Sequence, residues 1–273
     1  MDYFLDSNIS LENLKDNIFY YPFSGLDYEV PVRIFADFIS EFWFVDTNYF
    51  SGSASIDSQP SFKGALEGFT FIKETFVGSK IAQIIYPDRV AGKNFKQLAA
   101  GYLEQLFSYK EKIIKIIFRR GFDYTSLFGP SELEIAAKRL GIFFFRGTST
   151  EGGSDHPWIS NREVRMLYGE KKVRLLSKVL DALPDGGLIV TDGSLGYGHN
   201  QAVLKTNEYY PLHQFSTQRS ITSNDAYQMA HGFKDSKDNL FTCIGHAGMK
   251  NGPTLVWQVR KSGFISIIEI NSL

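Results

Sequence analysis

Apolar residues along this chain occur in two patterns, short unbroken runs and stretches with helical spacing. Residues 17–23 and 41–46 form short aromatic and β-branched runs, which are typical of strands buried on both faces. Pro31 suits an early helical position. Between the two runs, apolar residues recur at i, i+3, i+4 and i+7, at Val32, Phe35, Ala36 and Ile39. The pattern therefore predicts a strand, a helix and a second strand.

The same succession of helix and strand returns after Pro130. Ser131 and Glu134 have the spacing of a capping box at the start of a helix. A short apolar run at 142–145 predicts a strand, residues 161–183 predict a helix, and 188–192 predict the next strand.

The last predicted strands are residues 239–245 and 254–260, joined by a turn that contains Gly252 and Pro253. Alternating strands and helices that end in a hairpin indicate a mixed sheet. We therefore expect an α/β fold, a Rossmann-like mixed sheet with helices on both faces and a C-terminal antiparallel hairpin.

An insertion is expected after the second strand. The Ser- and Gly-rich stretch 51–60 predicts an exposed loop, and residues 51–90 exceed what a simple βαβ unit requires. Residues 81–86 and 112–118 read as strands, and the apolar positions from Phe95 to Leu106 predict an amphipathic helix. We expect residues 1–273 to form a single domain with an insertion at about 51–90.

Composition narrows the class of protein only modestly. The chain has 273 residues, 43% hydrophobic residues and a formal net charge of −1, so no general attraction to nucleic acid or anionic lipid is expected. The single cysteine, Cys243, excludes an internal disulfide and lies in an apolar run, which favours a buried, inert thiol. No run is apolar over the length of a membrane span. A cytoplasmic protein is expected.

The turn after the first strand is the strongest candidate ligand site. Gly25 precedes Asp46 by twenty-one residues, close to the spacing between the phosphate turn and the ribose-binding acid of nucleotide-binding units. We expect Ser24, Gly25 and Asp27 to lie at the turn, with Asp46 at the end of the second strand. The structural alternatives are a simple turn at Gly25, a helix cap at Asp27 and a strand-ending turn residue at Asp46.

Together with the segment Pro184-Asp-Gly-Gly-Leu-Ile-Val190, this layout resembles the class I S-adenosylmethionine-dependent methyltransferases. The resemblance covers residues 17–46 and 140–260. It implies a glycine loop after the first strand, an acid that ends the second, and a glycine turn before the fifth. The cofactor that it implies is S-adenosylmethionine, held by Ser24, Gly25, Asp27 and Asp46. The family's cofactor loop normally has two or three glycines, whereas this turn has one.

The loop after residue 145 is a second candidate. In a doubly wound sheet it follows a carboxyl end, where ligands bind. We expect Asp155 and His156 to act as catalytic acid or base groups. Substrate contacts are expected from Arg146, Glu151 and Trp158, the last through its ring face. The structural alternative is a polar loop anchored by Trp158.

The segment 191–199 begins at the end of the predicted fifth strand, 188–192. Its Asp192 is a further candidate catalytic residue, and His199 is a candidate substrate contact. No metal-ligand spacing appears in the sequence, so no metal site is predicted.

Two basic clusters are expected to be solvated faces rather than nucleic-acid sites. The first cluster surrounds the predicted strand at 112–118 and comprises Lys110, Lys112, Lys115, Arg119 and Arg120. The second lies on the predicted helix at 161–183 and comprises Arg162, Arg165, Lys171, Lys172, Arg174 and Lys178.

The functional expectation is methyl transfer from S-adenosylmethionine, a small-molecule cofactor, to an acceptor that the sequence leaves unidentified. Nucleic acid and membrane are not expected partners. One alternative is a non-catalytic binding module that keeps the sheet and has lost the cofactor site. The other is a metal- or acid/base-dependent hydrolase built on the loops 146–158 and 191–199.

Overall fold

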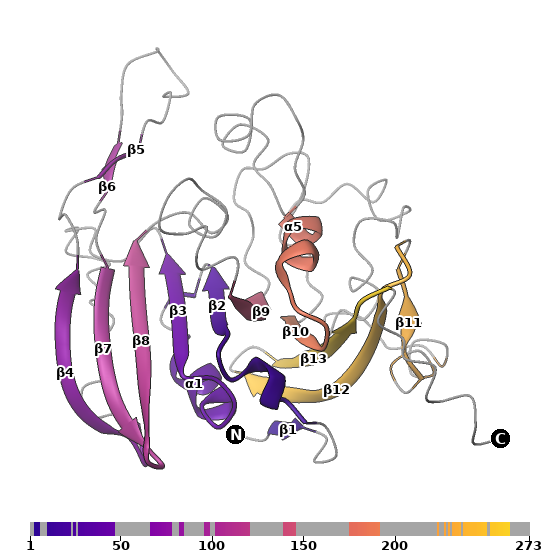
Figure 1. Ribbon diagram of the computed structural model, residues 1–273, viewed down its shortest axis with the longest axis horizontal. Helices are drawn as coiled ribbons and strands as arrows, with labels where there is room; N and C mark the ends of the chain where they lie inside the picture. The colour runs from indigo at the N-terminus through magenta and orange to yellow at the C-terminus, as the bar shows by residue number, and fades with distance from the viewer. Residues whose placement is uncertain are drawn as a thin grey trace. The chain divides into compact units, whose positions relative to one another are not determined.

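The fold was analysed in a computed structural model of the chain (Figure 1). It describes residues 3–5, 10–22, 24–25, 27–46, 66–77, 82–84, 96–98, 102–120, 139–145, 175–191, 223, 227, 229, 231–235, 237–249 and 252–262. The chain divides into two compact units. Unit 1 comprises Met1–Leu14, Leu140–Asn161 and Val173–Leu273, and unit 2 comprises Lys15–Arg139 and Arg162–Lys172.

Unit 2 begins with a β-α-β succession. Strand β2 (Ile18–Pro22) is followed by helix α1 (Glu29–Phe35) and strand β3 (Glu41–Asp46). β2 and β3 pair in parallel, and β3 pairs in parallel with β8 (Lys112–Arg120). These elements agree with the predicted strand, helix and strand, and with the strand predicted at 112–118.

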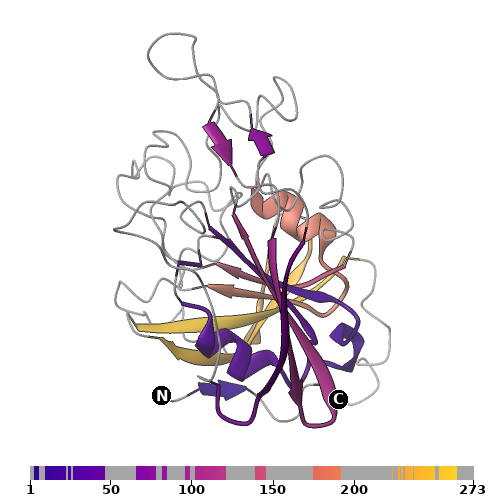
Figure 2. The same cartoon turned by 90° about the vertical axis from the view of Figure 1, so that its left-hand side faces the viewer.

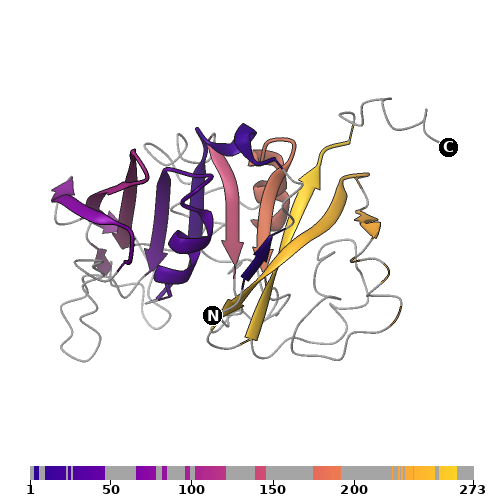
Figure 3. The same ribbon diagram turned by 90° about the horizontal axis from the view of Figure 1, so that it is seen from below.

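An aromatic core fixes α1 on one face of these strands (Figure 3). Phe19 contacts Phe42 and Phe44 of β3, with ring centroids 5.2 and 5.8 Å apart, and Phe35 of α1 at 5.6 Å. All four rings are fully buried. Because side chains alternate along a strand, Glu41 and Trp43 lie on the opposite face.

Two antiparallel strands extend the sheet of unit 2. Strand β7 (Tyr102–Tyr109) pairs with β8, and β4 (Thr70–Val77) pairs with β7, with a bulge between Phe71 and Lys73. The strand order is therefore β2-β3-β8-β7-β4. Figure 2 views the strands of unit 2 from the side of β4, fanned out by the twist of the sheet. A separate two-stranded ribbon joins β5 (Ala82–Ile84) and β6 (Lys96–Leu98).

The strands of unit 1 also pair in both parallel and antiparallel directions. Strand β9 (Leu140–Phe145) pairs in parallel with β10 (Gly187–Thr191), and helix α5 (Leu175–Ala182) lies between them in the sequence. Strand β13 (Gly252–Arg260) is antiparallel to both β10 and β12 (Leu240–Met249), and two short strands flank β12. These are β1 (Tyr3–Leu5) and β11 (Phe233–Lys234), and both pair with β12 antiparallel. A 3₁₀ turn, η1, spans Glu12–Leu14. The predicted C-terminal hairpin is formed by β12 and β13.

The predicted helices on both faces of the sheet are not found, and this expectation was wrong. The described residues form mostly strands and contain two α-helices, α1 and α5. The physical reason is that many neighbouring strands are antiparallel: β4, β7, β12 and β13 all have antiparallel partners. Antiparallel neighbours can be joined by a tight turn, whereas parallel neighbours need a crossover that is usually helical. The helix predicted from Ser131 and most of the helix predicted at 161–183 lie outside the described residues.

The helix predicted from Phe95 to Leu106 is also wrong. Residues in this range form β6 and the start of β7. In β7, Gln105 and Phe107 are buried while their neighbours are half-buried, which is the period of a strand. Pairing with both β4 and β8 satisfies the backbone of β7 on its two sides and outweighs its local helical spacing. Within the predicted insertion at 51–90, the structure describes β4 and β5.

None of the helices in the described part of the chain has the length and apolar character needed to cross a bilayer.

The β7–β8 turn contains two residues with left-handed backbone conformation. Lys110 and Glu111 have φ of 44° and 66°, as the two central positions of a type I′ turn require. The turn is attached to the end of α1, because Lys110 Nζ lies 2.8 Å from Asp37 Oδ1 and Lys112 Nζ donates to the Asp37 carbonyl at 2.8 Å.

We expect Glu111→Gly to raise the free energy of unfolding by about 0.5–1 kcal/mol. Glycine has no Cβ to clash in the left-handed region, and the strain that this removes exceeds the extra backbone entropy that glycine loses on folding. Urea denaturation measures the change. Glu111→Ala is the matched control, since alanine keeps the Cβ and gains nothing. Equal midpoints for Glu111→Gly and Glu111→Ala would contradict the assigned strain.

Candidate functional site

The candidate site lies at the carboxyl edge of the parallel strands of unit 2. The register pairs Pro22 of β2 with Val45 of β3, and Asp46 of β3 with Arg120 of β8. All three strands therefore end at the same edge. In open α/β sheets this is the edge at which ligands bind.

The turn after β2 is bonded directly to the end of β3. The Ser24 amide donates to the Val45 carbonyl at 3.3 Å, and Ser24 is 2% exposed. Gly25 follows with a φ of 51°, in the left-handed region that favours glycine. A Cβ added at Gly25 meets no atom of the described residues within 4 Å. The structure thus brings Ser24 and Gly25 beside the strand end that carries Asp46.

Asp27 closes the turn. Its amide donates to the Ser24 carbonyl at 2.9 Å, and its carboxylate accepts a long hydrogen bond, 3.5 Å, from the Tyr21 hydroxyl. Glu29 at the start of α1 forms an ion pair with Arg33, 2.7 Å apart. Asp27 is half-buried, so it remains a candidate contact for a polar ligand group.

The other predicted site residues are not placed. The catalytic candidates Asp155, His156 and Asp192 lie outside the described residues, and so do the substrate candidates Arg146, Glu151, Trp158 and His199. Within the described part of the chain, no group of three or more His, Cys, Asp or Glu side chains is arranged to hold a metal ion. Burial raises the pKa of the Cys243 thiol, which donates to the Gly245 carbonyl at 3.6 Å.

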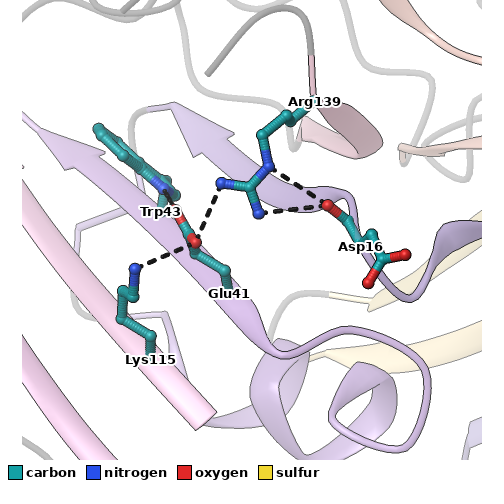
Figure 4. Close-up of polar contacts among 5 residues, drawn as sticks. All are labelled: Asp16, Glu41, Trp43, Lys115 and Arg139. Atoms are coloured by element: carbon teal, nitrogen blue, oxygen red, sulfur yellow. Dashed lines mark hydrogen bonds and ion pairs between the residues drawn. The ribbon is translucent and has the colours of Figure 1, made fainter. Parts of the chain in front are cut away.

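A polar cluster that the sequence reasoning missed lies at the opposite, amino edge of the same strands (Figure 4). Glu41, 8% exposed, accepts a hydrogen bond from the Trp43 indole at 2.8 Å. Its other oxygen lies 3.3 Å from both Lys115 Nζ and an Arg139 guanidinium nitrogen. A charged residue at the start of an apolar strand, two positions before a tryptophan, was the available signal.

Through Arg139, this cluster connects the two ends of the segment Lys15–Arg139 of unit 2. Its guanidinium donates to the Asp16 carbonyl at 3.2 and 3.3 Å, and its own carbonyl accepts the Ile18 amide at 2.6 Å. Since the cluster lies away from the candidate ligand-binding edge and joins the ends of this segment, we assign it a stabilising role.

The cluster controls the charge state of Glu41. Burial alone raises the pKa of this carboxyl group, but the Trp43 hydrogen bond and the charges of Lys115 and Arg139 outweigh it and hold the pKa below its usual value. A carboxyl group whose folded pKa is lowered stabilises the protein above its unfolded pKa. That stability is lost as the pH falls through the folded pKa.

We expect Glu41→Gln to lower the free energy of unfolding at pH 7 by about 2 kcal/mol, because two cations and an indole lose a charged acceptor. The loss should shrink as the pH falls below about 4.5, where the carboxyl group of the unfolded chain begins to protonate, and through the lower pKa of the folded carboxyl group. Urea denaturation across this pH range measures both. Glu29→Gln, at an exposed ion pair, should cost less than about 0.5 kcal/mol; a similar cost for both variants would contradict the assignment.

Comparison of the chain with protein-family models, curated proteins and solved structures found no match. The functional argument therefore rests on the geometry of the site.

Proposed function

We propose that this chain binds S-adenosylmethionine at the carboxyl edge of β2 and β3 and transfers its methyl group to an acceptor. One observation carries the proposal: the Ser24–Val45 hydrogen bond holds the Gly25 turn against the strand that ends in Asp46. A glycine turn beside a strand-ending acid suits a nucleoside whose ribose hydroxyls need an acceptor.

The residues present fit such a ligand. The open surroundings of Gly25 among the described residues leave room that a side chain would fill, so a ligand can approach the backbone closely. Asp46 supplies a carboxylate for ribose hydroxyls, and Asp27 a second acceptor within the turn. The parallel succession β2, β3, β8 also follows the order of one half of a nucleotide-binding sheet.

The cofactor supplies an activated methyl group. The protein's part is to align the acceptor with it and to exclude water, with a general base only where the acceptor must lose a proton. Asp155, His156 and Asp192 remain the proposed residues for that role. A cytoplasmic location belongs to the same proposal and is supported by the single cysteine of the chain.

We expect isothermal titration calorimetry to detect S-adenosylmethionine and S-adenosylhomocysteine binding to the wild-type protein. Asp46→Ala should weaken both by about 10- to 100-fold, the loss of hydrogen bonds to a charged acceptor. Asp37→Asn is the matched control, because this exposed carboxylate pairs with Lys110 and should leave the affinity unchanged. Absence of binding to the wild type, or equal affinities for Asp46→Ala and wild type, would refute the proposal.

Gly25→Ala separates ligand binding from folding. The left-handed backbone makes alanine cost about 1 kcal/mol of stability, while the added methyl group occupies the space assigned to the ligand. We expect S-adenosylmethionine affinity to fall by more than about tenfold, or 1.4 kcal/mol, with the protein still folded by circular dichroism. An unchanged affinity would show that no ligand approaches this turn.

A non-catalytic binding module is the second candidate, favoured by strand β4. Three large apolar side chains are exposed on it, Phe71 at 38%, Ile72 at 48% and Phe76 at 38%, and exposed apolar groups on an outer strand suit pairing with another chain. Calorimetry that detects no S-adenosylmethionine binding would favour this candidate.

A further inference from the structure

The outer edge of the sheet of unit 2 is formed by β4. Among the described strands β4 pairs with β7 alone, at the end of the order β2-β3-β8-β7-β4 (Figure 1). It is eight residues long, and every residue from Thr70 to Phe76 is exposed. A strand at the end of a sheet presents the backbone N–H and C=O groups of its outer side to a further strand. The edge of β4 is therefore suited to pairing with another chain.

The side chains of β4 are partly fixed before any partner arrives. The Phe71 ring lies against the Phe107 ring of β7, with centroids 5.6 Å apart. Glu74 accepts a hydrogen bond from the side-chain amide of Gln105 at 2.7 Å. Because ordered side chains lose little conformational freedom on binding, a partner strand would retain more of the free energy gained by covering the exposed apolar groups.

The charge of Lys73 sets a condition on the partner. The Lys73 ammonium group has no hydrogen-bond or ion-pair partner among the residues that the structure describes. An exposed lysine on an outer strand discourages indiscriminate pairing, and so does a bulge such as the one between Phe71 and Lys73. Opposite charges that face each other across two strands attract, whereas like charges repel. The edge therefore favours a partner strand with an acidic side chain opposite Lys73.

A second copy of this chain does not meet that condition. Two copies related by a two-fold axis would pair β4 antiparallel, so that opposite side chains share one face of the sheet. Lys73 and Glu74 are consecutive beyond the bulge and point to opposite faces, so they cannot lie opposite each other. The registers that pair most of β4 are centred on one of these residues and set it against the same residue of the copy, which is repulsive.

We propose that β4 binds an extended segment of a different protein, which adds a strand to the sheet. The segment places an acidic side chain opposite Lys73 and apolar side chains against Ile72 and Phe76. In this mode of recognition, backbone hydrogen bonds supply affinity, and alternate side chains supply specificity. The proposal is independent of methyl transfer, because β4 forms the outer edge of the sheet and the candidate cofactor site lies at the ends of β2 and β3.

The test titrates the full chain into fluorescein-labelled peptides and follows fluorescence anisotropy. The acidic peptide is Thr-Ile-Thr-Thr-Glu-Ile-Thr, whose Glu lies opposite Lys73 when its first Ile lies opposite Phe76 in an antiparallel pair. The basic peptide has Lys in place of that Glu. We expect the wild-type protein to bind the acidic peptide at least about fivefold more tightly than the basic one, and Lys73→Glu to reverse this preference. Failure of the acidic peptide to bind, or a preference that Lys73→Glu leaves unchanged, overturns the proposal.

Two exposed isoleucines give a matched pair of variants. Ile72 of β4 is 48% exposed, and Ile113 is 52% exposed on β8, which lies between β3 and β7. We expect Ile72→Thr to weaken binding of the acidic peptide by at least about fivefold, because apolar contact is lost. Ile113→Thr should keep the wild-type affinity. Equal effects of the two substitutions place the peptide elsewhere and refute binding at β4. Circular dichroism confirms that each variant is folded.

Backbone methylation distinguishes an added strand from side-chain contact alone. Two forms of the acidic peptide carry N-methyl groups on alternate amides, one form on each side of the strand. Since only one side of an added strand bonds to its neighbour, we expect one form to lose at least about tenfold in affinity and the other to keep it. Equal affinities of the two forms contradict strand addition.

Sedimentation velocity tests the choice of partner. We expect the wild-type protein to sediment as a monomer at the concentrations used in the titrations, since β4 repels its own copy. A dimer that Ile72→Thr dissociates and Ile113→Thr leaves intact would assign the edge to a second copy and overturn the proposal of a different protein.

Discussion

The parallel pairing of β2 with β3 is the constraint on which the rest of unit 2 depends. Parallel neighbours need a crossover, and α1 supplies it while covering the aromatic face formed by Phe19, Phe42 and Phe44. The same pairing aligns the carboxyl ends of the two strands. Ser24 and the residue before Asp46 are hydrogen-bonded because of this alignment, so the candidate ligand site is a direct consequence of how the core packs.

The amino and carboxyl edges of β2, β3 and β8 differ in the polar groups that they carry. At the amino edge, Glu41 is buried among opposite charges, and Arg139 ties the segment's last residue to its first turn through the Asp16 carbonyl. Nearly every polar group in this cluster is used internally, which suits a stabilising contact. At the carboxyl edge the glycine turn leaves space among the described residues, and β4 ends and β7 begins there. The stabilising cluster and the proposed ligand site are therefore separated along the same strands.

Local patterns predicted the elements of the first strand–helix–strand unit and the C-terminal hairpin, because each depends on contacts close in the sequence or on strong turn signals. They failed at residues 95–106, where apolar positions fit a helix. Tyr102 to Tyr109 instead pairs with β4 and β8, and such long-range backbone bonds outweigh weak local preference. The expected helices on both faces failed for a related reason, since antiparallel strands occupy positions that were assigned to crossovers.

By itself, the sequence determined where several buried strands lie, among them those at 18–22 and 41–46. It also determined that Gly25 and Asp46 have the spacing of a nucleotide site, since both results follow from hydrophobic period and chain order. Only the tertiary structure decided which residues lie together. The Glu41–Arg139 contact joins residues almost a hundred positions apart, and the position of β7 depends on its pairing with both β4 and β8. A charged residue in an apolar strand marks Glu41 in the sequence, but the partners of Glu41 and of β7 cannot be read locally, because each contact arises between distant segments.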